Sequence, residues 1–399
     1  MKVYNDNSLV NLSNSILKCF DTPTFHDSIP EIDEKLKGHK KVVAVLFDGM
    51  GQNITRMHLK ENSFIRTHYV TTINSTFPPT TAAATTAFLT GKYPIETGWL
   101  SWSQYFKDYN RNIILFRSKD YNTFEDLIKP GETPIALRYF PLKKLPELIN
   151  EAHPNIATKA LYRFPIEDAQ GPKTFLSGAH MINKFLKNNK ECFLYYYWDT
   201  PDGEMHEYGI DNHIAHRRVL KIQRFMKRVT KKNPDTVFIL FADHGHINVE
   251  FTDICDHEDL YSLLYRPMTL DKRSPTFFVK EENHQKFVEL FNKYYGNDFD
   301  LFTKQEVLDM KLFGEGEPAK GVLDAFGEFV AIAKTNKVLY GSKEMDKVVI
   351  LKGHHAGGTK EERLIDVSMY NVYWYNNQAF GELLLWINVN YLYARLLYL

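Results

Sequence analysis

The sequence contains few cysteines, no excess of charge of one sign and no long uninterrupted apolar run. Its 399 residues include only 3 cysteines, so a bound metal would need nitrogen and oxygen ligands rather than a thiolate cluster. Lys plus Arg number 49 and Asp plus Glu number 49, which lacks the basic excess of proteins that bind nucleic acids or anionic membranes. The hydrophobic fraction of 44% is that of a globular protein. We expect one catalytic domain over residues 1–399.

The two ends of the chain also lack targeting features. The N-terminal MKVYNDNSLVNLSNSILKCF has no uninterrupted apolar stretch, which a secretory signal requires. We therefore expect a cytoplasmic protein with reduced thiols. The apolar segment 379–399 carries Glu382 and Arg395, whereas a membrane span needs about 20 apolar residues. We expect it to pack as a closing strand and helix, with an interfacial membrane helix as the alternative, and we do not expect membrane association.

Short apolar runs alternate with helical segments along the chain. The runs that predict buried strands are Lys41–Phe47, Ala157–Leu161, Glu191–Trp198 and Thr236–Ala242. The segments that predict helices include Thr81–Leu89, Thr174–Lys187 and His213–Lys231. This alternation predicts an α/β fold, a three-layer αβα sandwich with a mostly parallel central sheet. Segments 101–150 and 256–345 break the rhythm, and we expect them to form a smaller inserted cap or lid.

Three of the predicted strands end in acidic or Asp-His clusters. Asp48 follows the first strand, Asp199 and Asp202 follow the third, and Asp243-His244 follows the fourth. In an open α/β sheet, ligands bind outside the carboxyl ends of the strands. We therefore expect these carboxylates to converge on one edge of the sheet.

Histidines accompany these carboxylates at spacings that suit a shared ion. Asp202 and His206 are four residues apart, so one helical turn would direct both side chains at one ion. Gly245 permits a backbone turn that would let Asp243 and His244 reach one ion. The histidine pair in Gly353–Gly358 is flanked by glycines, which indicates close backbone approach to something bound.

A hydroxyl-rich segment, Ser75–Thr81, precedes the Ala-rich predicted helix. A hydroxyl at a helix N-terminus can cap the helix. The same position suits a nucleophile, because the helix dipole and free N–H groups favour an alkoxide and a bound phosphate. A threonine hydroxyl is weak at neutral pH and needs a base or a metal to activate it. The sequence has no P-loop and no G-x-S-x-G motif, so metal activation is the simplest explanation.

Five motifs together resemble the alkaline phosphatase superfamily, and most closely its type I phosphodiesterase/nucleotide pyrophosphatase family. They occur in family order and with similar spacing, and they are FDGMG at 47–51, PTTAAATTAFLTGKYP at 79–94, DGEMHEYG at 202–209, ADHGH at 242–246 and GHHAGG at 353–358. The resemblance implies two divalent metals, most commonly zinc. Manganese also suits Asp and His ligands.

The resemblance also implies a role for each motif residue. The first metal would be held by Asp48, Asp243 and His244. The second would be held by Asp202, His206 and His355, with His354 as the alternative to His355. The nucleophile would be Thr81, with Thr80 as its close competitor, and the reaction would pass through a phosphothreonine. We interpret His246 either as an outer residue that orients a ligand or as a packed histidine.

One position departs from the family pattern and bears on the substrate. Many diesterases of the family place an Asn shortly after the nucleophile helix to hold a phosphoryl oxygen, and Trp102 occupies the corresponding position here. The nucleophile segment 74–89 contains no Arg or Lys, which favours a diester or pyrophosphate over a monoester dianion. We expect a small phosphate ester or nucleotide as substrate. A phosphomonoesterase and a non-catalytic binding protein are the alternatives.

Overall fold

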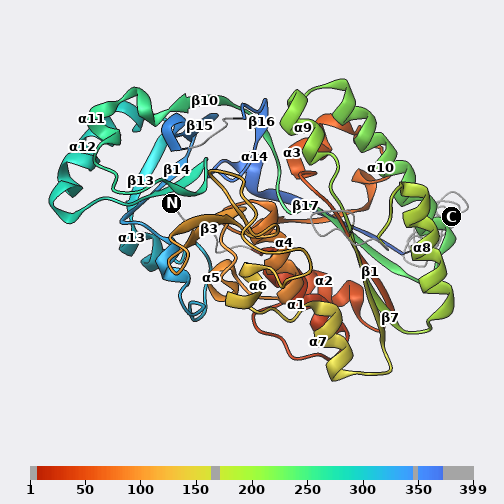
Figure 1. Ribbon diagram of the computed structural model, residues 1–399. Coiled ribbons are helices and arrows are strands. Elements are labelled where there is room, and N and C mark those ends of the chain that lie inside the picture. The colour runs from red at the N-terminus through yellow and green to blue at the C-terminus, as the bar shows by residue number, and fades with distance from the viewer. Residues whose placement is uncertain (1–6, 163–170, 345–348, 372–399) are drawn as a thin grey trace, which may run out of the picture.

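The computed structural model describes residues 7–162, 171–344 and 349–371. Its centre is a six-stranded sheet in the order β2-β17-β8-β1-β7-β6 (Figure 1). Strands β8, β1, β7 and β6 are parallel, whereas β17 is antiparallel to both β8 and β2. The bounds are β1 Lys41–Phe47, β2 Tyr69–Asn74, β6 Ala157–Tyr162, β7 Cys192–Trp198, β8 Val237–Phe241 and β17 Leu364–Tyr370.

The central strands are apolar because both of their faces are covered. All seven residues of β7 and all five of β8 are buried, as expected for parallel strands between two helical layers. The register pairs Phe47 with Trp198 and Leu46 with Phe241. The carboxyl ends of β1, β7 and β8 therefore lie side by side at one edge of the sheet.

Two groups of helices cover the sheet. One group surrounds α1 and the other surrounds α10, and Figure 1 shows them on opposite sides of the sheet. The first group is α1 Leu9–Cys19, α2 Pro30–Leu36, α4 Thr81–Thr90 and α7 Leu145–Ala152. The second is α3 Gln52–His58, α8 Phe175–Asn188, α9 Asp202–Tyr208 and α10 His213–Lys232. The fold is thus a three-layer αβα sandwich.

Segments 101–150 and 256–345 contribute no strand to the central sheet. The first forms a small sheet with short helices, which comprises β3 Ser103–Phe106, β4 Arg111–Ile114, β5 Lys119–Asp120 and α6 Ile135–Tyr139, before it enters α7. The second forms a four-stranded sheet with helices, which comprises β11 Thr269–Asp271, β12 Ser274–Phe277, β13 Phe299–Thr303, β14 Phe329–Ala333, α11 Glu258–Tyr261, α12 His284–Tyr295 and α13 Lys304–Asp309. Strands β3 and β11 are in contact. Their role as a cap stays a prediction.

Short elements complete the described chain. Two two-stranded sheets pair β10 with β15 and β9 with β16, and two short helices, α5 and α14, precede β3 and β17. Their bounds are β9 Ile247–Asn248, β10 Glu250–Asp253, β15 Lys337–Tyr340, β16 Gly353–His354, α5 Pro94–Thr97 and α14 Lys360–Arg363.

Within the described residues, the four predicted strands and the three predicted helices are present, each within one residue of its expected ends. The prediction missed β2 and β17, which close one side of the sheet. The apolar segment 379–399 lies outside the described residues. Within the described ranges, no helix combines the length and the hydropathy needed to cross a membrane.

Candidate active site

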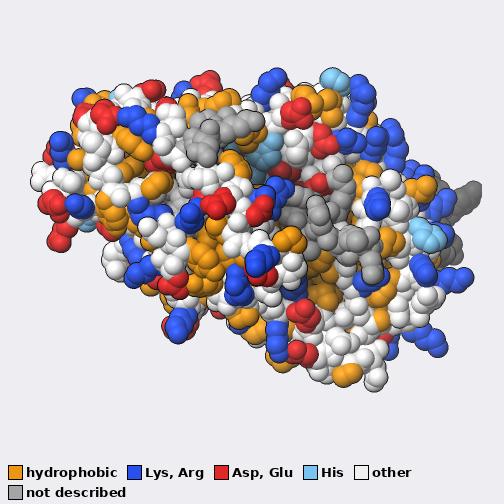
Figure 2. All heavy atoms as spheres, in the orientation of Figure 1, with side chains coloured by type: hydrophobic (Ala, Val, Ile, Leu, Met, Phe, Trp, Pro, Cys, Tyr) orange, Lys and Arg blue, Asp and Glu red, His pale blue; other side chains and the backbone are white. Residues whose placement is uncertain are grey.

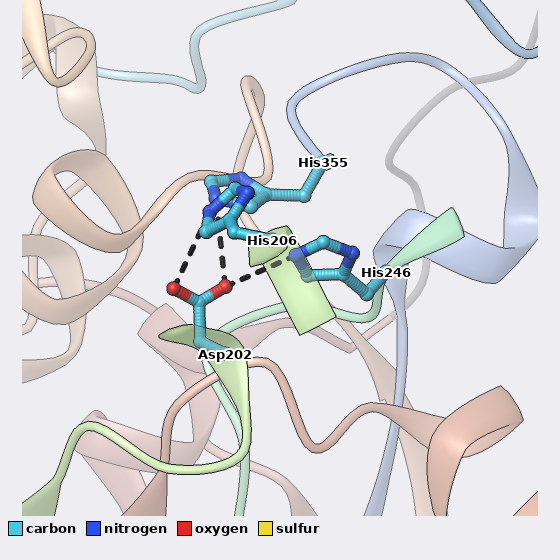
Figure 3. A group of neighbouring side chains, drawn as sticks. All are labelled: Asp202, His206, His246 and His355. Atoms are coloured by element: carbon cyan, nitrogen blue, oxygen red, sulfur yellow. Dashed lines mark ion pairs between the residues drawn. The ribbon is translucent and has the colours of Figure 1, made fainter. Parts of the chain in front are cut away.

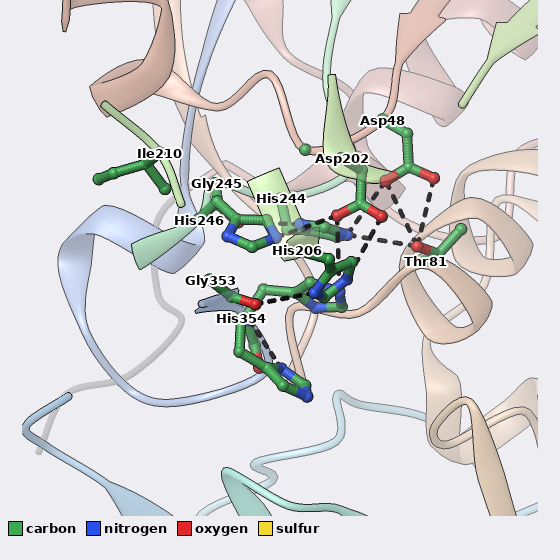
Figure 4. A network of polar contacts seen from close by, with 12 residues as sticks. Asp48, Thr81, Asp202, His206, Ile210, His244, Gly245, His246, Gly353 and His354 are labelled. Carbon is green, nitrogen blue, oxygen red and sulfur yellow. Dashed lines mark hydrogen bonds and ion pairs between the residues drawn. The ribbon is translucent and has the colours of Figure 1, made fainter. Parts of the chain in front are cut away.

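Thr81 lies at the start of helix α4, at the edge of the central sheet. Thr80 is the N-cap residue, and Gly91 ends the helix in the left-handed conformation with φ of 68°, which glycine adopts without strain. The Thr81 hydroxyl lies 3.3 Å from Asp48 Oδ2 and 3.3 Å from His244 Nε2 (Figure 4). The first turn of a helix leaves N–H groups without helical acceptors. The hydroxyl is thus surrounded by potential metal ligands and lies beside free backbone donors.

Asp48, Asp243 and His244 form the first cluster, which we call the Asp48 group. One donor atom from each lies within 4.8 Å of the others, and all three residues are buried. The loops after β1 and β8 approach closely, because a Cβ on Gly51 would lie only 2.5 Å from the Cα of Gly245. This contact requires glycine and brings the carboxylates of two strands together.

Asp202, His206, His246 and His355 form the second cluster, the Asp202 group, and their donor atoms also lie within 4.8 Å of one another (Figure 3). Helix α9 carries Asp202 in its first turn and His206 one turn later, with 3.4 Å between Asp202 Oδ2 and His206 Nε2. The rings of His244 and His355 stack at 3.7 Å between centroids. The two groups are therefore immediate neighbours.

Backbone carbonyls orient three of the histidines. The Nδ1 atoms of His244, His206 and His355 lie 2.9, 2.8 and 3.0 Å from the carbonyl oxygens of Gly245, Gly353 and Pro79, respectively. We assign the Nδ1 proton of each to this hydrogen bond, which leaves Nε2 as the acceptor whenever the ring is neutral. A second hydrogen bond of this kind is the usual arrangement of a metal-binding histidine.

Both groups have the chemistry of divalent cation sites. Each contains a buried carboxylate oxygen without a hydrogen-bond partner among the described residues, Asp243 Oδ2 in one and Asp202 Oδ1 in the other. Burial raises the pKa of Asp243 well above its ordinary value, and the adjacent Asp48 raises it further. Burial opposes protonation of His244, yet Asp243 and Asp48 raise the pKa of its imidazole to about 10. A bound cation would neutralise this concentrated negative charge.

The other predicted residues lie around these groups. His354 lies outside both, and its Nδ1 lies 2.8 Å from the carbonyl oxygen of His355. Thr80, Trp102 and His354 line the cavity that also exposes Thr81. His246, which the sequence left between an outer and a packed role, lies inside the Asp202 group. Figure 2 shows histidine side chains at the surface in the upper middle of the face displayed.

The cavity over the site has a volume of about 450 Å³. Segment 256–345 contributes Asp271 and Lys272 to its lining, and Tyr121 and Phe124 come from the other insertion. The sequence did not single out these residues, because their approach to the motifs is a long-range contact. It also missed Tyr197, whose hydroxyl donates a hydrogen bond to Asp48 Oδ2. The strand pattern placed Tyr197 one residue before the end of β7, and only that position could have indicated the contact.

Four aromatic residues, Trp99, Trp102, Tyr105 and Phe106, follow helix α4 in the sequence, and three of them are packed within the protein. Trp99 and Phe106 belong to a hydrophobic core, and the Arg266 guanidinium lies 3.4 Å from the centroid of the Tyr105 ring. Trp102 differs, because it lines the cavity. It is therefore the one of these four side chains that is placed to meet a substrate.

Three solved structures of similar fold are of ectonucleotide pyrophosphatase/phosphodiesterase 5. Murine ectonucleotide pyrophosphatase/phosphodiesterase 5, as an inactive variant in complex with AMP, is 16% identical, with 84% of this chain and 88% of that chain covered and a TM-score of 0.57. A second structure of the murine protein is 17% identical (82% and 87% covered, TM-score 0.57). The human protein is 14% identical (83% and 88% covered, TM-score 0.57). These identities establish likeness of fold alone.

A comparison with curated proteins finds no match. The family described as type I phosphodiesterase/nucleotide pyrophosphatase matches residues 42–358. That range contains all five motifs and both clusters, and it spans most of the chain. The protein therefore belongs to the type I phosphodiesterase/nucleotide pyrophosphatase family of the alkaline phosphatase superfamily, and it is a hydrolase of this type.

Proposed function

We propose that the protein hydrolyses phosphodiester or pyrophosphate bonds in small nucleotide-like substrates, through a phosphothreonine at Thr81 and with two divalent metal ions. The position of the Thr81 hydroxyl carries this proposal. It lies at the start of a buried helix, 3.3 Å from both Asp48 and His244, in the cavity that opens over both clusters.

The Asp48 group would hold one ion. Asp202, His206 and His355 would hold the other. When bound, the two ions would lower the pKa of the hydroxyl and neutralise charge on the attacking and leaving oxygens. The histidine content favours zinc, and manganese is the alternative that the Asp and His donors also suit.

The protein groups would then act in two displacements. In the first, Thr81 Oγ1 gives its proton to solvent and bonds to phosphorus, while the bond from phosphorus to the leaving oxygen breaks and that oxygen takes a proton from water. The backbone N–H groups in the first turn of α4 face the developing negative charge. In the second, water attacks phosphorus, releases the phosphate product and restores the hydroxyl. Because His244, His206 and His355 are occupied as ligands, neither step uses a histidine as general base.

The residues that line the cavity support the proposal of a nucleotide-like substrate. Trp102, Tyr121 and Phe124 line it and offer aromatic faces to a base. The AMP bound in a murine relative of the same fold is consistent with this proposal. Lys272 lines the cavity as well, and its ammonium lies 5.8 Å from the centroid of the Phe251 ring. A lysine at this position could pair with a second negative charge on the substrate phosphate. A pyrophosphate carries such a charge and is the favoured substrate, and a phosphomonoester is the second candidate.

Replacing Lys272 with methionine tests this assignment of substrate charge. Burial lowers the pKa of Lys272, so an anionic substrate group would be a strong partner for its ammonium. A hydrogen bond to a charged group contributes about 1.5–3 kcal/mol, so kcat/KM for a nucleoside triphosphate or nitrophenyl monophosphate should fall at least about tenfold. Turnover of a nitrophenyl phosphodiester should change little. The exposed Lys280→Met serves as control. Equal losses on all substrates would contradict the assignment.

Removal of metal tests whether the protein is a catalyst of this kind or a binding protein. Dialysis against a chelator should reduce hydrolysis of a nitrophenyl phosphodiester to background, because a threonine hydroxyl needs activation. Zinc should restore the activity, and manganese provides the comparison. Metal content is measured by mass spectrometry on the same samples. Full turnover with less than about one ion per chain would contradict the two-metal site, and metal binding without turnover would favour the binding protein.

A further inference from the structure

His246 lies in the loop after β8, two residues beyond His244. Gly245 separates them, and its N–H donates to the carbonyl oxygen of Glu362 at 2.7 Å. A Cβ on Gly245 would lie 1.9 Å from the carbonyl oxygen of Glu361. The loop is thus held against the segment that follows the GHHAGG motif. His244 enters the Asp48 group and His246 enters the Asp202 group.

The imidazole of His246 faces the carboxylate of Asp202. Its Nε2 lies 3.3 Å from Asp202 Oδ1, the oxygen that is also 3.8 Å from Nε2 of His355. The ring centroid of His246 lies 4.6 Å from that of His206 and 5.5 Å from that of His355. Figure 3 shows the four side chains converging from three segments of the chain. The Nε2 atom of His246 therefore lies as close to the Asp202 carboxylate as the Nε2 atoms of His206 and His355, the two histidines that the family motifs identify.

The hydrogen bonding of His246 also distinguishes it from a packed histidine. Its side chain is fully buried, Nδ1 has no hydrogen-bond partner among the described residues, and Nε2 faces Asp202 Oδ1 at 3.3 Å without the geometry of a hydrogen bond. A buried polar group without a partner is costly. Gly353 keeps the space beside the ring open, because a Cβ there would lie 2.8 Å from His246 Cε1. Binding of an ion through Nε2 would satisfy one of the two nitrogens.

We propose that His246 is a fourth protein ligand of the second metal ion, together with Asp202, His206 and His355. This proposal rests on the proposed two-metal function. It gives the two metal sites different numbers of protein ligands. The first ion would have three protein donors and the second ion four, so the second ion should be retained more tightly.

Treatment with increasing chelator tests whether the two sites retain zinc differently, and it does not rely on enzymatic activity. Zinc-loaded wild type, His246→Ala and His58→Ala are treated with increasing dipicolinate, and the remaining zinc per chain is counted after gel filtration. His58 is the control, because it is also a buried imidazole but bonds to the Ile210 carbonyl away from both groups. Wild type and His58→Ala should retain one ion after the other has left. His246→Ala should lose both zinc ions together. Its zinc affinity at the second site should fall by more than roughly 100-fold, which is the largest loss expected from removing a residue that only hydrogen-bonds to a ligand.

A crystal structure of the zinc-loaded wild type decides the matter even if the variant does not fold. Anomalous scattering at the zinc edge should place the second ion about 2.0–2.1 Å from His246 Nε2. An ion bound by Asp202, His206, His355 and water, with His246 bonded only to Asp202, would overturn this inference and leave the proposed function intact. Absence of zinc from both groups would instead contradict the proposed function.

Discussion

Replacing Thr81 with alanine is expected to reduce kcat for a nitrophenyl phosphodiester by at least about 10³-fold, because removal of a covalent nucleophile leaves only binding and charge stabilisation. Both metal groups should keep their ligands, so zinc content should match that of the wild type. Steady-state kinetics and metal analysis measure the two quantities on the same preparation.

Two further variants make the Thr81 result specific. Thr80→Ala removes the neighbouring hydroxyl, which the sequence left as a competitor, and it should keep most of the activity. Thr81→Ser keeps a hydroxyl at the same atom position and should retain measurable turnover. Acid quench of the wild type during turnover of a labelled substrate should trap phosphate on the peptide that contains Thr81. Full activity in Thr81→Ala, with loss of activity in Thr80→Ala, would identify Thr80 as the nucleophile instead of Thr81.

Replacing Arg273 with methionine is expected to have the largest effect on stability. Its guanidinium is fully buried and forms two hydrogen bonds with Glu362, from Nε to Oε1 at 2.7 Å and from Nη2 to Oε2 at 2.8 Å. Breaking a buried ion pair by removing one partner costs about 3–5 kcal/mol, because the other charge stays buried without compensation. Urea denaturation followed by fluorescence should show this loss.

The same substitution should also make the Asp48 group and the Asp202 group less rigid. Glu362 accepts hydrogen bonds from the Gly357 N–H and the Thr359 hydroxyl, and its carbonyl accepts from Gly245. It thus connects Arg273, in segment 256–345, to the loops of His355 and His244. Zinc affinity should therefore fall together with stability.

Two comparisons isolate the buried pair. The double variant Arg273→Met, Glu362→Gln should recover part of the lost stability, since no charge then stays buried alone. Lys311→Met removes a partner from the exposed Lys311–Glu315 pair, whose side chains are 62% and 64% accessible, and it should unfold as the wild type does. An unfolding transition of Arg273→Met that coincides with the wild type would contradict this account.

The sequence predicted those parts of the fold whose signals are local. The apolar runs that became β1, β7 and β8 are continuous because their strands are buried on both faces. The helix predicted over Thr81–Leu89 became α4, which ends at Gly91 in the left-handed conformation. By contrast, β2 and β17 pair with each other across the sequence, with Asn74 opposite Leu364. Half-exposed residues in β2 gave it no apolar run to recognise.

The sequence by itself indicated most candidate donors and their order, because Asp48, Asp202 and the Asp243-His244 pair follow apolar runs and His206 lies one helical turn after Asp202. Only the tertiary structure decided which ring enters which group. Adjacent histidines such as His354 and His355 point in different directions according to the backbone of their loop, and that backbone depends on contacts with distant segments. The same long-range packing brought Lys272 into the cavity, joined Arg273 to Glu362, and turned His246 towards Asp202. Such contacts join residues far apart in the chain, so no local pattern of residue types specifies them.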